Sequence, residues 1–315
     1  MSARPSASLS ENAGIGAEAV SGAFWAAASG VGFGAFQTVN RRAVARMDVY
    51  VATLIQLAIA LVVLVVAAVV TGEAARVGSM PSAAFAWFIA GGAAHFFVGW
   101  TLLNISQQRI GAARTTPLIS TNPVFGAGVA IVTLGEFPSA LSWLGIALIT
   151  GGAYVVAAER LLHGAPAGAI TWRDSTFGLG CALAWAISPV LIRKGLEGFD
   201  SPLLGVTLGL AASLAGYLIV LAGRDHRLDR RSLGDALWLK VLAGVLVALS
   251  TWVRWVALER TSIGIVLALG LMSVPVVLLL SPVLMGREVE RVNIYVWLGA
   301  ALVVGGSLLL VWRAR

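Results

Sequence analysis

Ten apolar stretches of about 20 residues each follow one another along this 315-residue chain. The hydrocarbon core of a bilayer is about 30 Å thick, and an α-helix needs about 20 residues to cross it. The composition agrees, because 58% of the residues are hydrophobic, 12% are charged and the mean hydropathy is +0.89. We therefore expect an all-α integral membrane protein with ten transmembrane helices, at residues 19–40, 50–71, 82–106, 112–134, 141–158, 175–192, 203–223, 236–258, 263–285 and 293–312.

The first 18 residues are rich in Ser, Ala and Gly and lead directly into an apolar stretch of full spanning length. This arrangement predicts a disordered tail over residues 1–18 rather than a cleaved signal peptide. Most Lys and Arg residues behind the net charge of +7 lie at span ends, where they anchor helices to lipid headgroups. We therefore expect a lipid bilayer as partner, and no nucleic acid.

The two halves of the chain repeat one another. Pro123 and Pro275 are 152 residues apart, and the same interval separates Trp100 from Trp252. The stretches STNPVFGAGVAIVTLGE (120–136) and MSVPVVLLLSPVLMGRE (272–288) are two versions of one segment, each a span interrupted by proline.

This repeat predicts the domain organisation: a first five-helix repeat at 19–159, a connecting loop at 160–174 and a second five-helix repeat at 175–315. Five is an odd number, so the second repeat enters the membrane from the opposite side to the first. Inverted repeats of this kind are common in secondary transporters, which bind their substrates between the halves near the midplane.

Residues 102–152 and 255–306 carry the shared features: a proline-interrupted fourth span, a glycine-glutamate ending and a glycine pair in the fifth span. This pattern resembles the EamA-type branch of the drug/metabolite transporter superfamily. The resemblance implies a basket-like bundle whose first, third, fourth, sixth, eighth and ninth helices surround a central cavity. Members carry amino acids, amines, sugars, nucleotide sugars or drugs, so the resemblance does not select a substrate.

No Asp or Glu falls in the middle of a predicted span. The related small multidrug resistance proteins use a membrane-embedded glutamate for proton-coupled efflux, whereas the first span here offers Gln37 and no acid. An uncoupled facilitator, an exchanger or a histidine-coupled carrier fits better. His95 lies about 20 Å deep in the third span and has an unperturbed pKa near 6.5, so it could switch charge, or simply be a neutral imidazole bonded to a neighbouring helix.

Away from the span ends, the other polar residues are neutral, except for Arg254. Neutral groups either bond helices together or line a wet path. Asn104 and Asn122 are the better candidates for the path, because amides are costly to leave unmatched in hydrocarbon. Asn122 has Val274 as its counterpart, which predicts a cavity more polar on one side. Arg254 either binds an anion in the cavity or anchors its helix at the interface.

The tryptophans of the cavity-lining helices could stack on a cationic or aromatic solute, or could simply pack. Pro123 and Pro275 remove the usual helical partners of the Ile119 and Leu271 carbonyls, which is tolerable only where protein or cavity water satisfies them. The predicted substrate pathway comprises Trp25, Gln37, His95, Asn104, Thr121, Asn122, Pro123, Trp185, Trp252, Ser273 and Pro275. A stripe of small residues in the first span predicts close approach of another helix: Gly22, Ala26, Gly30 and Gly34.

No catalytic or metal-ligand motif stands out in the sequence, so we expect neither an enzyme nor a metal or cofactor. The predicted function is inner-membrane export of a metabolite or amino acid by alternating access, with a small-molecule solute as partner and a monomer or homodimer as the assembly. Multidrug or amine efflux is the alternative, and a non-transporting membrane enzyme or assembly partner is the rival class. The distribution of Lys and Arg among the loops favours external termini, whereas the family resemblance favours cytoplasmic termini.

Overall fold

The computed structural model describes residues 7–134, 139–162, 172–222, 234–261, 263–286 and 292–312, and every regular element in these ranges is helical. The first half contains α1 (Ala7–Val44), α2 (Val49–Val70), η1 (Glu73–Ser79), α3 (Ser82–Gly92), η2 (Ala93–Gly99), α4 (Trp100–Ile110), α5 (Ala112–Ile119), α6 (Asn122–Leu134) and α7 (Ala140–Leu162). The second half contains α8 (Trp172–Gly198), α9 (Pro202–Ala222), α10 (Gly234–Arg260), α11 (Ile263–Gly270), α12 (Ser273–Met285) and α13 (Ile294–Trp312).

These elements correspond to the two sets of five spans expected from the sequence. The third span is one continuous rod, Ser82–Ile110, made of α3, the π-helical segment η2 and α4. The fourth span is divided into α5 and α6, and the ninth into α11 and α12. α1 begins at Ala7, ahead of the span expected from residue 19, and the division into a tail, two repeats and a loop stays a prediction.

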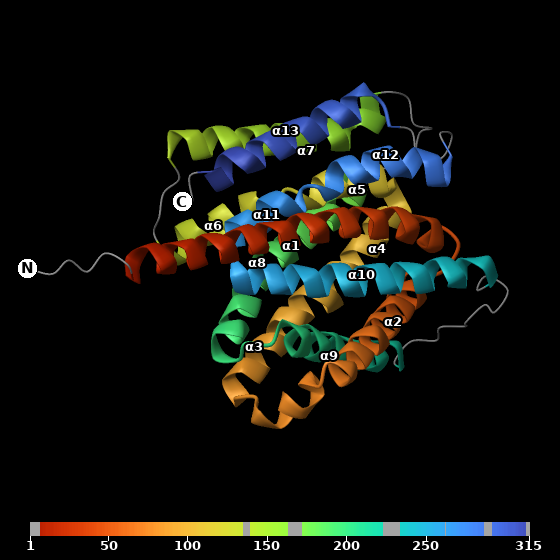
Figure 1. Ribbon diagram of the computed structural model, residues 1–315. Coiled ribbons are helices and arrows are strands. Elements are labelled where there is room, and N and C mark those ends of the chain that lie inside the picture. The colour runs from red at the N-terminus through yellow and green to blue at the C-terminus, as the bar shows by residue number, and fades with distance from the viewer. Residues whose placement is uncertain are drawn as a thin grey trace, which may run out of the picture.

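The two halves pack against each other in a way that follows their inverted relation (Figure 1). α1 runs alongside α10, and its counterpart α8 runs alongside α3, η2 and α4. Two further pairs each join equivalent helices of the two halves: α7 packs on α13, and α2 packs on α9. All these contacts join one half to the other, so neither half forms a bundle of its own.

Glycines permit the closest of these crossings. A Cβ at Gly92 on α3 would lie 2.2 Å from the Cα of Gly209 on α9, so the two backbones touch. The small-residue stripe of α1 faces the interrupted ninth span, because a Cβ at Gly30 would lie 2.6 Å from the Leu269 carbonyl and one at Gly34 would lie 2.7 Å from Val276. α1 thus packs tightly on both α11 and α12.

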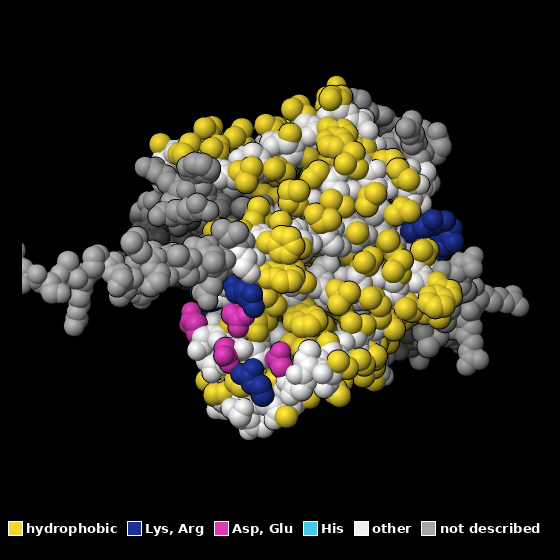
Figure 2. Space-filling model, in the orientation of Figure 1, with side chains coloured by type: hydrophobic (Ala, Val, Ile, Leu, Met, Phe, Trp, Pro, Cys, Tyr) yellow, Lys and Arg dark blue, Asp and Glu magenta, His cyan; other side chains and the backbone are white. Residues whose placement is uncertain are grey.

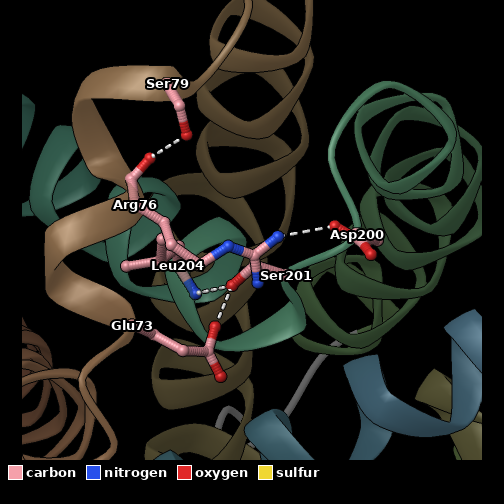
Figure 3. Close-up of polar contacts among 6 residues, drawn as sticks. All are labelled: Glu73, Arg76, Ser79, Asp200, Ser201 and Leu204. Carbon is pink, nitrogen blue, oxygen red and sulfur yellow. Dashed lines mark hydrogen bonds and ion pairs between the residues drawn. The ribbon is translucent and has the colours of Figure 1, made fainter.

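Polar contacts join the two halves at one end of the bundle (Figure 3). Arg76 of η1 forms a 2.7 Å ion pair with Asp200, in the turn between α8 and α9. Ser201 accepts a 3.1 Å hydrogen bond from the Leu204 amide at the start of α9 and donates a hydrogen bond to Glu73. The turn after α2 is therefore held to the turn before α9.

The surface is apolar between two charged ends (Figure 2). Hydrophobic side chains cover the middle of the visible face, whereas Lys, Arg, Asp and Glu gather toward the ends. On α2, the exposed side chains are a run of valines that includes Val62, Val66 and Val69. Within the described ranges, five helices are long and apolar enough to cross a membrane, and α12 is among the shorter apolar helices. Such a surface suits lipid, not water.

Candidate substrate-binding site

The fourth and ninth spans are interrupted at equivalent places. α5 ends at Ile119 and α6 begins at Asn122, while α11 ends at Gly270 and α12 begins at Ser273. Pro123 and Pro275 lie in the first turns of α6 and α12, where a missing backbone N–H costs no helical hydrogen bond. Pro275 offers no N–H to the Leu271 carbonyl, and the protein satisfies this carbonyl in another way: it accepts a 2.9 Å bond from the Val274 amide, one residue earlier than in an α-helix.

A cavity lies at these two breaks, between the halves. Its lining combines residues of α1, η2, both breaks, α8 and α10: Ser29, Gly30, Phe33, His95, Ile119, Ser120, Asn122, Trp185, Ser250, Thr251, Arg254, Leu267, Gly270, Leu271 and Ser273. The cavity volume is about 40 Å³. A water needs roughly 10 to 15 Å³ of such space, so the cavity can hold a few waters. An organic solute can enter only if the surrounding helices move apart.

Aromatic rings form one wall of the cavity. The His95 and Trp185 rings stack 5.2 Å apart at 15°, and Phe33 meets Trp185 edge to face at 5.2 Å. The Trp185 indole N–H donates a 3.1 Å hydrogen bond to the His95 carbonyl, and His95 Nδ1 lies 2.9 Å from the Ser188 hydroxyl. His95 lies inside the π-helical segment η2, and π-helical turns are frequent at functional sites. The wall therefore joins η2 of one half to α8 of the other.

Arg254 of α10 supplies a positive charge to the cavity. A Cβ at Gly270 would lie 3.2 Å from Arg254 Nη1, so the guanidinium rests against the end of α11. Of the two interpretations of Arg254, the structure supports the cavity-facing one. Arg260, six residues further along α10, is exposed and shows what an interface anchor looks like in this helix.

Four of the predicted pathway residues line the cavity: His95, Asn122, Trp185 and Ser273. Thr121 faces a neighbouring, mostly apolar groove between α5, α6, α7 and α8. The other six predicted residues are not among the lining residues: Trp25, Gln37, Asn104, Pro123, Trp252 and Pro275.

Sequence reasoning missed Ser29, Phe33, Ser120, Ser250 and Thr251 as lining residues. Ser250, Thr251 and Arg254 are spaced as neighbours on one helical face, a signal that could have marked the eighth span as cavity-facing. The second half also contributes Ser273, so it is not the greasier side that the Asn122–Val274 comparison suggested.

Gln37 and Asn104 belong to a buried polar network at one end of the bundle. Asn40 is its centre and donates hydrogen bonds to the Asn104 oxygen at 2.7 Å and the Gln107 oxygen at 2.8 Å, while Gln107 donates to Gln37 at 3.3 Å. All four side chains are fully buried. In this state the amides join α1 to α4 instead of lining the cavity.

Lys240 of α10 joins this network from the other half. Its ammonium group is fully buried and donates hydrogen bonds to the side-chain oxygens of Asn40 and, at 2.7 Å, Gln56. No Asp or Glu among the residues that the structure describes forms an ion pair with it. The hydrogen bonds of Lys240 therefore cross from the second half to the first.

The equivalent position at the opposite end of the bundle is apolar. Phe88, 152 residues before Lys240, lies 5.9 Å from Trp255 in a tilted ring contact. A Cβ at Gly195 or Gly205 would lie 2.6 Å from the Phe88 ring, so α8 and α9 both press on it. The two equivalent positions thus differ in character: hydrogen bonds surround Lys240, and aromatic packing surrounds Phe88.

Inverted halves, paired broken spans and a small cavity between them define a multi-pass membrane transporter of the inverted-repeat type. The chain belongs to the EamA-like transporter family, whose sequence signature matches residues 20–158 and 175–312. This confirms the resemblance seen in the sequence and places the protein among transporters rather than enzymes.

The fold is similar to that of a known crystal structure, with a TM-score of 0.62 over 91% of this chain and 97% of the other. The two sequences are 17% identical, so this likeness concerns the fold alone. A comparison with curated proteins found no match.

Proposed function

We propose that the protein exports a small organic solute, a metabolite or an amino acid, by alternating access. One observation supports this most directly: both halves line one cavity at their broken spans, and its volume of about 40 Å³ excludes an organic solute. In alternating access, a cavity of this kind widens toward one side of the membrane and then toward the other. Rocking of the halves would separate either the polar end around Lys240 or the aromatic end around Phe88.

The helix ends at the breaks suit solute binding. α6 and α12 begin at the lining residues Asn122 and Ser273, and the N-terminus of a helix carries partial positive charge. Broken helices in transporters direct such ends toward anionic substrate groups. Amine efflux, the alternative function, fits less well, because Arg254 would repel a cation from this cavity.

The direct test is counterflow in proteoliposomes, with a panel of amino acids, amines, sugars and sugar phosphates as solutes. We expect accumulation of labelled solute against excess unlabelled solute inside, and none in protein-free liposomes. Absence of counterflow for the whole panel, with no binding, would contradict the proposal.

Cysteine accessibility provides a second test of the access mechanism. Cys181 is the single cysteine and is buried, so a Cys181→Ala background accepts new probes at cavity positions. We expect maleimide labelling of Asn122→Cys and Ser273→Cys to change when a transported solute is added. Val62→Cys, on the lipid-facing side of α2, is the control whose labelling the solute should leave unchanged.

Coupling through His95 also stays a prediction. Transport measured from about pH 5.5 to 8 in wild type and His95→Ala would test it. An unchanged pH profile in the variant would remove His95 from a coupling role.

A further inference from the structure

Resting on the proposed function, we infer that the transported solute carries a carboxylate and that the Arg254 guanidinium binds it. Four observations support this inference: the position of Arg254, the absence of a partner for it among the described residues, the charge of the cavity wall, and two free polar side chains at the breaks.

Arg254 has no internal partner, whereas three other arginines of the bundle have one. Arg109 pairs with Asp174 at 2.6 Å, Arg76 pairs with Asp200 at 2.7 Å, and Arg193 donates to two backbone carbonyls. Arg254 forms no hydrogen bond or ion pair with any residue in the described ranges. A guanidinium has five donors, and a charge within a membrane protein is normally paired or hydrated. Its partner should therefore come from the cavity contents.

The charge of the cavity wall limits the class of solute. Arg254 is the one permanently charged residue among the lining residues, and no Asp or Glu is among them. A single guanidinium balances one negative charge, and its planar fork matches the two oxygens of a carboxylate. A phosphate monoester carries up to two charges and would leave one unbalanced. The wall therefore favours a monocarboxylate.

Two further side chains are free to orient this group. Asn122 and Ser273 line the cavity, are more than nine-tenths buried and form no side-chain hydrogen bond with the described residues. They stand at the first residues of α6 and α12, one on each side of the contact between the halves. Phe33 and Trp185 offer the opposite character, an apolar wall for the remainder of the solute. The recognised molecule is thus a carboxylate attached to an apolar group.

Four related solutes separate the contribution of the carboxylate from that of the amine. Leucine has both groups, and 4-methylpentanoate lacks the amine. Leucinamide lacks the carboxylate charge, and isopentylamine lacks the carboxyl group. We expect wild-type proteoliposomes to show counterflow of leucine, 4-methylpentanoate or both, and little of the amide or amine. Arg254→Gln should lower carboxylate counterflow by at least about tenfold, since a charge-assisted hydrogen bond contributes about 1.5 to 3 kcal/mol.

Two further variants and a folding check serve as controls for Arg254→Gln. Arg260→Gln removes an exposed arginine from the same helix and should leave the counterflow of all four solutes unchanged. Arg254→Lys keeps the charge but loses the fork, and should retain a part of the carboxylate counterflow. The thiol of Cys181, which is buried in the native fold, reports whether each variant is folded.

The outcomes distinguish this inference from the proposed function. Counterflow of the amide or amine equal to that of the carboxylates, or carboxylate counterflow unchanged in folded Arg254→Gln, would overturn the inference and leave the transport function standing. Failure of these four and of the wider solute panel would overturn the proposed function, and the inference with it.

Discussion

The contact between α3 and α9 is so close that the effect of one added methyl group on the free energy of unfolding can be predicted. In Gly92→Ala, the new Cβ would lie 2.2 Å from the Cα of Gly209, whereas ordinary contacts begin at 3.4 Å. The obstacle is backbone, so no side chain can rotate away, and the helices would have to separate by about 1.2 Å locally. A gap of 0.5 to 1 Å already loses about a quarter to a half of the dispersion energy across a contact. We expect a loss of about 2 to 3 kcal/mol in the free energy of unfolding, at the upper end for overpacked cores.

Two other glycines allow the stabilities of three Gly→Ala variants to be ranked. A Cβ at Gly209 would lie 2.9 Å from the Cα of Gly92, a milder overlap, so Gly209→Ala should lose less stability. A Cβ at Gly151 on α7 meets nothing within 4 Å, so Gly151→Ala should be neutral or slightly stabilising, because alanine favours the helix. The expected order of melting temperatures is Gly92→Ala lowest, then Gly209→Ala, then Gly151→Ala.

The protein supplies its own reporter for the assay. Cys181 is the single cysteine and is buried, so a thiol-reactive fluorescent maleimide labels it when the detergent-solubilised protein unfolds on heating. A Gly92→Ala protein that melts together with Gly151→Ala would refute the reasoning, because it would mean that the two backbones are not in contact.

Three further substitutions can be followed with the same assay. Asn40→Ala should lower the free energy of unfolding by about 3 kcal/mol, because it removes the acceptor of one Lys240 hydrogen bond and the donors to Asn104 and Gln107. Stability equal to wild type would contradict the hydrogen-bond network. Gly111→Ala should cost about 1 to 3 kcal/mol, because Gly111 turns the chain between α4 and α5 at φ 83° and ψ 165°, which residues with a Cβ rarely adopt; no change would mean that φ is not positive here. Trp185→Phe keeps the stacked ring but deletes the hydrogen bond to the His95 carbonyl, so a loss of about 1 kcal/mol is expected, and a gain in stability would speak against that bond.

The broken spans show what can be predicted from local sequence. Pro123 and Pro275 are equivalent residues of the two repeats, and this pairing predicted the two interruptions. A proline alone would not have been enough, because Pro189 and Pro282 lie inside α8 and α12. The 152-residue interval between Pro123 and Pro275 and the odd number of spans then implied inverted halves. The depth of His95 followed as well, because depth along a helix depends only on residue count.

The direction of a side chain around its helix could not be predicted in the same way. Asn104 and Asn122 are equally polar and lie equally within spans, yet Asn122 lines the cavity while Asn104 is bonded to Asn40. The difference depends on which helix packs against each face. The sequence of one span does not contain this information.

The sequence by itself determined that this chain spans a membrane as two inverted, proline-broken halves, because hydropathy and the repeat interval can be read directly along the chain. Only the tertiary structure decided the roles of the charged residues within the spans. Lys240 lies near the start of α10, yet it is buried because α1 and α2 bring oxygens to it. Arg254 could have reached the headgroups, yet it lines the cavity because α10 packs alongside α1 with that face inward. Whether a charge is buried, paired or free is decided by its neighbours, and for Lys240 those neighbours come from the other half of the chain.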